Sequence, residues 1–80
     1  MNIEDKKILI TGGTGFLGSN LIRYLIKNRN VKPQNIRVFY LENTPTNALE
    51  GVIGLEMVPG NILNKDSVEK ACKDMDFVFH

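Results

Sequence analysis

Apolar residues along the chain follow two patterns, continuous runs and helical spacing. Four short apolar runs lie at 7–11, 36–41, 55–58 and 76–80. Runs of this length without strict alternation of polar residues are typical of parallel strands buried on both faces of a sheet. Pro59 and Gly60 follow the third run and are expected to close that strand. The pattern therefore predicts about four strands in one parallel sheet.

Between the first and second runs, apolar residues recur at helical spacing. Apolar residues at intervals of three and four are expected to form the buried face of an amphipathic helix: Leu17, Leu21, Ile22, Leu25 and Ile26. This helix is expected to end near Asn28, Asn30 and Pro33. Asparagine favours the left-handed conformation at a helix C-terminus, and proline cannot continue the hydrogen-bond ladder.

A second helix is predicted after Asn64, a residue type favoured at the N-cap. Asp66 would lie in its first turn, where the positive end of the helix dipole stabilises a carboxylate. Val68, Ala71 and Cys72 would form its buried face. We expect Cys72 to act in packing.

The connection 43–54 contains Pro45 and two glycines around Ala48, Leu49 and Glu50. These residues are compatible with one helical turn and with a loop. The remaining order alternates strands with helices, which predicts right-handed parallel crossovers and an α/β fold.

Residues 11–18 read Thr-Gly-Gly-Thr-Gly-Phe-Leu-Gly and join the first strand to the first helix. The N–H groups and partial positive charge of a helix N-terminus suit a pyrophosphate. Gly12 would allow a sharp exit from the strand, Gly15 would let a phosphate approach the backbone, and Gly18 would let the helix pack closely. No Gly-Lys-Ser/Thr follows, so this turn is not a triphosphate-binding P-loop.

These eight residues resemble the cofactor turn of the extended short-chain dehydrogenase/reductase family, which includes NAD-dependent epimerases, dehydratases and dihydroflavonol-reductase-like enzymes. The Gly-x-x-Gly-x-x-Gly spacing is one residue longer in its first interval than the ordinary dinucleotide fingerprint. The resemblance continues through 48–51, 60–62 and 76–80. It implies a partial Rossmann-like, doubly wound parallel sheet with helices on its faces. It also implies cofactor contacts from six residues of the turn: Gly12, Thr14, Gly15, Phe16, Leu17 and Gly18.

The family usually has Gly-Asp-hydrophobic after the third strand, where the acid and its neighbour lie along the adenine ring. Here Asn61 replaces the acid, and Ile62 follows. The carbonyl oxygen of Asn61 could accept a hydrogen bond from the adenine amino group. A simple Pro-Gly-Asn turn fits the same residues equally well, so both interpretations stay open.

The end of the second strand bears on cofactor choice, because a carboxylate there pairs with the ribose hydroxyls of NAD while arginine accommodates the 2′-phosphate of NADP. Leu41 occupies this position and Glu42 follows it. No lysine or arginine lies between Val38 and Asn64, which favours NAD over NADP. Glu42 could equally be a solvated loop acid, and Arg37 or Lys65 could fold back toward the site.

Catalysis in this family, as the resemblance implies, needs a Tyr-x-x-x-Lys pair with a serine or threonine. Tyr24 has Lys27 three positions on, and Tyr40 has Thr44 at the required interval. His80 is expected to be the last residue of a strand. We therefore predict no catalytic residue in this chain.

A complete doubly wound fold has about six strands, and four are expected here. We predict that residues 1–80 are the N-terminal portion of an NAD(P)-binding Rossmann domain, with catalytic and substrate parts absent. The parent would be an oxidoreductase, epimerase or dehydratase, and the alternative is a non-catalytic NAD(P)-sensing or interaction module. The edge of the fourth strand, at 77–79, is expected to self-associate or to exchange an element with a second chain.

Composition and charge mainly exclude certain partners, targeting segments and cysteine sites. Ten Lys and Arg against nine Asp and Glu give a net charge of +1, which does not indicate a nucleic-acid or acidic-membrane partner. Acids near the N-terminus do not fit a signal peptide, and the apolar runs are short, so we expect a cytoplasmic protein. With a single cysteine, neither an internal disulfide nor a cysteine metal cluster is expected.

Overall fold

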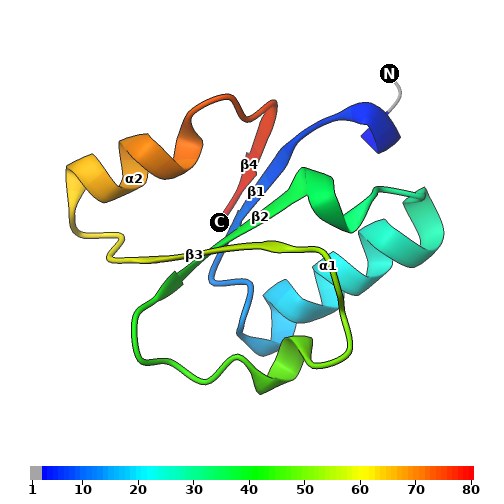
Figure 1. Ribbon diagram of the computed structural model, residues 1–80, viewed down its shortest axis with the longest axis horizontal. Coiled ribbons are helices and arrows are strands. Elements are labelled where there is room, and N and C mark those ends of the chain that lie inside the picture. The colour runs from blue at the N-terminus through cyan, green and yellow to red at the C-terminus, as the bar shows by residue number, and fades with distance from the viewer. Residues whose placement is uncertain (1–2) are drawn as a thin grey trace.

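A computed structural model describes residues 3–80. Its four strands are parallel and form one sheet in the order β3-β2-β1-β4. Their bounds are β1 Ile8–Thr11, β2 Ile36–Leu41, β3 Glu56–Gly60 and β4 Phe77–Phe79. The two helices are α1 Phe16–Arg29 and α2 Lys65–Cys72. Single 3₁₀ turns are η1 Ile3–Asp5, η2 Pro33–Asn35 and η3 Asn47–Leu49. The α/β fold with a four-stranded parallel sheet is as predicted (Figure 1).

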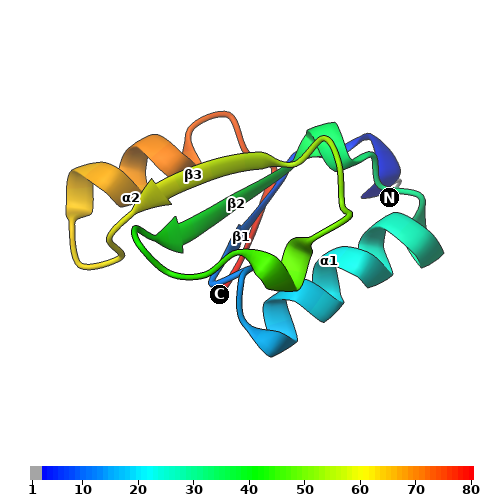
Figure 2. The ribbon, with the colours of Figure 1, turned by 60° about the horizontal axis from the view of Figure 1, so that its bottom comes forward.

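The two helices cover opposite faces of the sheet (Figure 2). On the α1 face, Ile8 and Ile10 pack in one buried cluster with Ile22 and Leu25 of the helix. On the α2 face, Leu9 and Phe39 pack with Ala71. Successive residues of β1 thus supply both cores, as expected for a strand buried on both faces.

Helix α1 has the predicted amphipathic face, with one correction. Ile22 and Leu25 are buried, and Leu21 and Ile26 pack partly buried against the same cluster. Leu17 is 80% exposed, because it lies in the first turn beyond the edge of the sheet. The helix ends as predicted at Asn30, which is left-handed with φ of 58°.

Helix α2 begins as predicted at Asn64, whose side-chain oxygen accepts a hydrogen bond from the Ser67 N–H at 3.1 Å. Ala71 is buried, whereas Val68 and Cys72 are half-buried. At the other end of the helix, Arg37 Nη1 donates to the carbonyl oxygen of Ala71 at 2.7 Å. An arginine of β2 therefore satisfies a C-terminal carbonyl of α2 that has no intrahelical partner.

Strand β3 differs from the sequence prediction, because Pro59 and Gly60 belong to the strand and do not close it. Pro59 pairs with Tyr40, and Gly60 pairs with Leu41. Since β3 lies at one edge of the sheet, it tolerates a proline that cannot donate to the ladder. The carboxyl end of β3 therefore lies beside that of β2.

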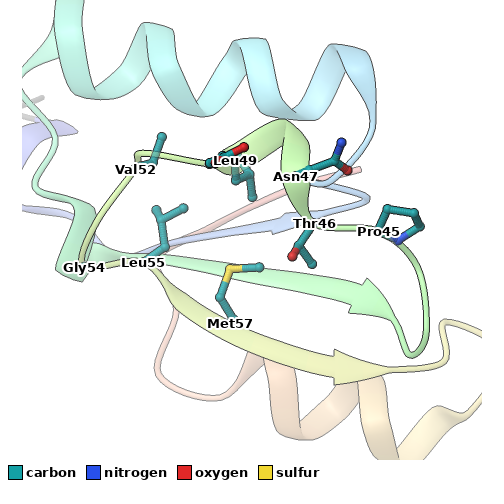
Figure 3. A pocket seen from close by; sticks show the side chains of 9 residues that line it. Pro45, Thr46, Asn47, Leu49, Val52, Gly54, Leu55 and Met57 are labelled. Atoms are coloured by element: carbon teal, nitrogen blue, oxygen red, sulfur yellow. The ribbon is translucent and has the colours of Figure 1, made fainter.

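The connection 43–54 contains one helical turn, η3, and no long helix. Leu49 of η3 is buried in the α1-face cluster. Arg23 of α1 holds the connection through its Nη2, which donates to the carbonyl oxygens of Ala48 at 2.9 Å and Glu50 at 3.2 Å. A cavity of about 540 Å³ remains between η3 and the sheet, where Leu49, Leu55 and Met57 line it (Figure 3).

Candidate functional site at the carboxyl edge of the sheet

The glycine turn leaves β1 as a sharp, hydrogen-bonded bend. Gly12 has a φ of +68°, which L side chains rarely adopt. Its N–H donates to the carbonyl oxygen of Phe39 at 3.0 Å, so β1 and β2 remain joined at this point. The Gly15 N–H donates to the Gly12 carbonyl oxygen at 3.0 Å and closes the turn. The structure thus supports the expected role of Gly12.

Close packing explains two other glycines. A Cβ on Gly18 would lie 2.5 Å from the Gly12 carbonyl oxygen and 2.7 Å from Gly13 Cα, so the helix approaches the turn backbone itself. A Cβ on Gly13 would lie 2.7 Å from Val38 Cγ1. Gly13 therefore packs against the sheet, a role that the sequence analysis did not assign.

Gly15 differs from these glycines, since a Cβ there would meet only the Gly12 carbonyl oxygen, at 3.4 Å. Its φ of −80° is also open to any residue. The fold itself therefore does not require glycine at this position. A requirement would have to come from something that approaches the turn from outside.

The N-terminus of α1 is open to such an approach. Its N-cap is Gly15, and Ser19 N–H to Gly15 oxygen, at 2.9 Å, is the first intrahelical bond. The N–H groups of residues 16–18 precede that bond, and the first turn contains no acidic residue. Phe16 is 79% exposed beside them. These N–H groups and the helix dipole suit an anion.

A cavity of about 700 Å³ lies at the carboxyl ends of the strands. Nine residues line it: Thr11, Gly12, Phe39, Leu41, Gly60, Asn61, Ile62, Leu63 and His80. A second cavity, of about 330 Å³, lies on the α1 side and shares Thr11, Gly12 and His80 with the first. Leu17 and Gly18 also line this second cavity. The glycine turn is therefore bordered by a mostly apolar recess at the sheet edge where doubly wound folds bind ligands.

The predicted site residues are only partly brought together. Gly12, Asn61 and Ile62 line the larger cavity, and Leu17 and Gly18 line the smaller one. The remaining four predicted residues line neither: Thr14, Gly15, Phe16 and Glu42. Sequence reasoning missed Phe39, Leu63 and His80. Pairing of β2 and β4 with β1 carries Phe39 and His80 to this edge, and Leu63 lies in the turn between β3 and α2. The signal for His80 was its position at the end of a predicted strand.

Asn61 forms the local turn, the second of the two interpretations that the sequence left open. Its Oδ1 accepts a hydrogen bond from the Leu63 N–H at 2.9 Å, which makes a local turn. The same residue lines the cavity, and a carbonyl oxygen has a second lone pair. Gly60 precedes it, and a Cβ there would lie 2.5 Å from Phe39 Cε1. The turn after β3 is therefore packed directly on the aromatic ring beneath the cavity.

The three charged residues that bear on cofactor choice, Glu42, Arg37 and Lys65, lie in different surroundings. Glu42 is exposed directly after Leu41, which is 55% exposed at the cavity. Arg37 lies at the opposite end of β2, where its Nε donates to Glu56 Oε1 at 2.9 Å. Lys65 is the first residue of α2, and its Nζ lies 3.9 Å from Glu69 Oε1. Arg37 is thus held away from the cavity.

Within residues 3–80, His, Cys, Asp and Glu do not form a group of three that could hold a metal ion. None of the helices in the same range is long and apolar enough to cross a bilayer. Tyr24 is half exposed on α1, and Tyr40 packs against the α1-face cluster.

The parallel sheet, the α1 glycine turn and the recess at the carboxyl edge together define a Rossmann-type fold. Residues 9–80 match the model of the 3-beta hydroxysteroid dehydrogenase/isomerase family. The chain belongs to this family, within the extended short-chain dehydrogenases/reductases, as its glycine turn predicted.

Relatives match over nearly the whole chain. An uncharacterised membrane protein of Methanocaldococcus jannaschii is 35% identical over 96% of this chain and 23% of its own length. UDP-glucose 4-epimerase of Rickettsia bellii is 32% identical over 95% of this chain and 24% of its own length. The crystal structure of Helicobacter pylori ADP-L-glycero-D-manno-heptose-6-epimerase superposes with a TM-score of 0.71 and 30% identity, over 100% of this chain and 27% of that one. This chain therefore spans about a quarter of the length of these relatives.

Proposed function

We propose that this chain binds the adenosine and pyrophosphate half of a dinucleotide, as part of an NAD(P)-dependent oxidoreductase, epimerase or dehydratase. One observation carries the proposal. The open N-terminus of α1, with glycine where the fold does not need it, borders the smaller cavity, which shares Thr11, Gly12 and His80 with the larger cavity at the carboxyl ends of the strands. Family membership supports the same activity, because dinucleotide binding is expected of these proteins.

In this proposal the pyrophosphate lies against the N–H groups of Phe16 and Leu17, and Gly15 leaves it room. Thr14 flanks the turn, while Gly12 and Gly18 fix its shape. The adenine ring occupies the recess between Leu41 and Ile62, both 55% exposed.

Asn61 would meet the adenine amino group through the lone pair that the Leu63 N–H leaves free. The site thus combines apolar walls with few polar contacts, which is usual for nucleotide pockets.

The proposed cofactor is NAD in preference to NADP. Glu42 is the carboxylate nearest in sequence to the cavity wall at Leu41, and it would pair with the ribose hydroxyls. Arg37 supports this preference, because its guanidinium already donates to Glu56 and to the C-terminus of α2. Lys65 is then the cation to test as a partner for a 2′-phosphate.

Glycine 15 offers the most direct test. Gly15→Asp places a favoured N-cap residue on α1, so the free energy of unfolding should rise by about 0.5 kcal/mol. The same carboxylate would occupy and repel the pyrophosphate site, so affinity for ADP-ribose should fall by about 100-fold. Calorimetric titration measures the affinity, and urea unfolding measures the stability.

Gly15→Asn is the matched control, since it has nearly the same size and capping ability without the charge. It should be about as stable as Gly15→Asp and should bind ADP-ribose more tightly than that variant. Absence of ADP-ribose binding in a folded parent chain, or unchanged binding in Gly15→Asp, would exclude the proposed site.

Cofactor preference is tested by titrating NAD and NADP separately. The parent chain should prefer NAD, and Glu42→Gln should weaken NAD binding by about fivefold, the loss of one charge-assisted hydrogen bond at an exposed site. Lys65→Gln should leave NAD binding unchanged. If Lys65→Gln selectively weakened NADP binding, the lysine would be the 2′-phosphate partner.

The proposed domain assignment follows from the same fold. Residues 1–80 would form the N-terminal portion of the cofactor domain, and catalytic and substrate-binding residues would lie elsewhere in the protein.

A cytoplasmic location stays a prediction from composition. One relative is named a membrane protein, so this prediction calls for direct fractionation of cells.

Self-association through β4 is also proposed. Among the described residues β4 pairs only with β1, and Val78 and Phe79 of this strand are 40% and 36% exposed. An edge with unpaired backbone groups and apolar side chains is a template for strand pairing. Light scattering should show dimers at high concentration. Val78→Lys should reduce them, and a strictly monomeric parent chain would exclude the proposal.

A further inference from the structure

His80 lies beside the glycine turn, although it is far from it in sequence. Ile10 of β1 pairs with Phe79 of β4, so the next residues, Thr11 and His80, are neighbours at the carboxyl edge. Thr11 Oγ1 donates to the Phe79 carbonyl oxygen at 3.2 Å and lies 3.2 Å from His80 Nδ1. The last residue before the glycine turn therefore holds the imidazole.

These contacts show which ring nitrogen threonine engages. Thr11 Oγ1 donates to the Phe79 carbonyl oxygen and also lies 3.2 Å from His80 Nδ1. The other ring nitrogen, Nε2, is left for a partner in the cavities that His80 lines.

Among the residues that line the two carboxyl-edge cavities, His80 is the only ionisable side chain, and it lines both. The rest of the lining comes from the carboxyl ends of the strands, from residues 61–63 after β3 and from α1, and is uncharged. Of the charged residues near the lining along the chain, Glu42 and Lys65 are exposed, and Arg23 and Arg37 donate to other groups. An anionic group in this recess would therefore have His80 as its one ionisable partner in the lining.

We infer that His80 is a cofactor-contacting residue that binds the pyrophosphate of a dinucleotide through Nε2–H, and that Thr11 is its positioning residue; this inference rests on the proposed function. The first turn of α1 offers partial charge and N–H groups, and the imidazole Nε2–H adds a side-chain donor from the β4 side of the turn. A hydrogen bond to a charged acceptor is roughly twice as strong as a neutral one. The pyrophosphate would thus be held from two directions.

The test compares two ligands. The chain, with the carboxylate of residue 80 amidated to remove its charge, is titrated by calorimetry with ADP-ribose, which carries the pyrophosphate, and with adenosine, which lacks it. ADP-ribose should bind more tightly than adenosine, and only its affinity should depend on His80.

Two pairs of variants separate binding from structure. His80→Asn keeps an amide that can donate to Thr11 but lacks the distal nitrogen. It should lose about tenfold in ADP-ribose affinity, with adenosine affinity unchanged. Thr11→Val should also weaken ADP-ribose binding, because it frees the ring, and Thr11→Ser should restore it.

The outcomes separate the two proposals. If the unsubstituted chain binds ADP-ribose and His80→Asn binds it equally, the inference about His80 is wrong and the proposed function stands. If adenosine affinity falls with that of ADP-ribose in His80→Asn, the residue supports the pocket structurally and the inference is again wrong. If the folded, unsubstituted chain binds neither ligand, both proposals fail.

Discussion

Two crossovers on the same face of the sheet are built in opposite ways. The β1–α1–β2 crossover has a 14-residue helix and a glycine turn that packs closely at Gly13 and Gly18. The β2–β3 crossover has only the three-residue turn η3, and it leaves a cavity of about 540 Å³ beside Met57 (Figure 3). Both contribute to one buried cluster.

The difference shows that close packing constrains the first crossover more than the second. In the first crossover Ile22 and Leu25 are buried, and Gly18 cannot gain a methyl group without moving backbone. In the second, only Leu49 is buried among residues 42–54, and Gly51 has open space at its Cβ position. We therefore expect stability and ligand geometry to depend mainly on the first crossover.

Core truncation should show the largest contrast. Ile22→Ala removes a fully buried side chain beneath the glycine turn and should lower the free energy of unfolding by about 4 kcal/mol. Leu49→Ala, at 6% exposure and beside an existing cavity, should cost about 2 kcal/mol. Urea unfolding measures both, and Ile22→Val provides a milder variant at about 1 kcal/mol if Ile22→Ala does not fold. Equal costs would contradict the contrast.

Adding one methyl group to a glycine should come next. Gly18→Ala brings Cβ within 2.5 Å of the Gly12 carbonyl oxygen and should cost about 3 kcal/mol. Gly51→Ala meets no atom within 4 Å and should cost about 1 kcal/mol, from its left-handed φ of +86° alone. Thermal unfolding of the two variants gives the comparison. A tolerated Gly18→Ala would mean that the turn relaxes more easily than its contacts indicate.

Removing the hydrogen bonds of Arg23, which link the two crossovers, should have a smaller effect on stability. Arg23→Met removes the hydrogen bonds to the carbonyl oxygens of Ala48 and Glu50 while keeping the apolar stem. Because the arginine is exposed, we expect a loss of about 1 kcal/mol or less. Amide hydrogen exchange should accelerate over residues 44–54 and stay unchanged in α1. Uniform acceleration would show that the two crossovers unfold together.

Lengthening the second crossover should have the smallest effect. Two glycines inserted between Thr44 and Pro45 should cost about 0.2 kcal/mol, because loop-closure entropy grows slowly with length. ADP-ribose affinity should be unchanged. The same insertion between Gly13 and Thr14 should abolish binding, since it shifts the N-terminus of α1 relative to β1. Loss of binding from both insertions would show that the second crossover also shapes the site.

Local sequence patterns predicted most of the elements correctly, and the errors have physical reasons. Asn64 and Asn30 mark the start of α2 and the end of α1 as predicted, because capping depends on nearby backbone groups. Leu17 fits helical spacing but is exposed, because the sheet ends below the first turn. Pro59 continues β3, because its strand lies at the sheet edge.

The candidate site also has residues that the sequence predicted and residues that only the structure connected to it. The turn residues Gly12 and Gly18 were predicted from a contiguous motif, and their backbone geometry agrees with the expected roles. His80 could not be connected to the turn by sequence alone, because strand pairing across 69 positions brings it to Thr11. Gly60 had appeared to be a strand terminator, whereas Phe39 excludes a side chain there.

The sequence by itself determined the α/β alternation, the glycine turn and the family, because each depends on residue types at fixed short spacings. Only the tertiary structure decided which strand ends meet, that Arg37 is committed to α2, and that Gly15 is free of packing constraint. Those facts depend on strand order and on distances between segments remote in sequence. Periodicity along one segment carries no information about strand order or about those distances.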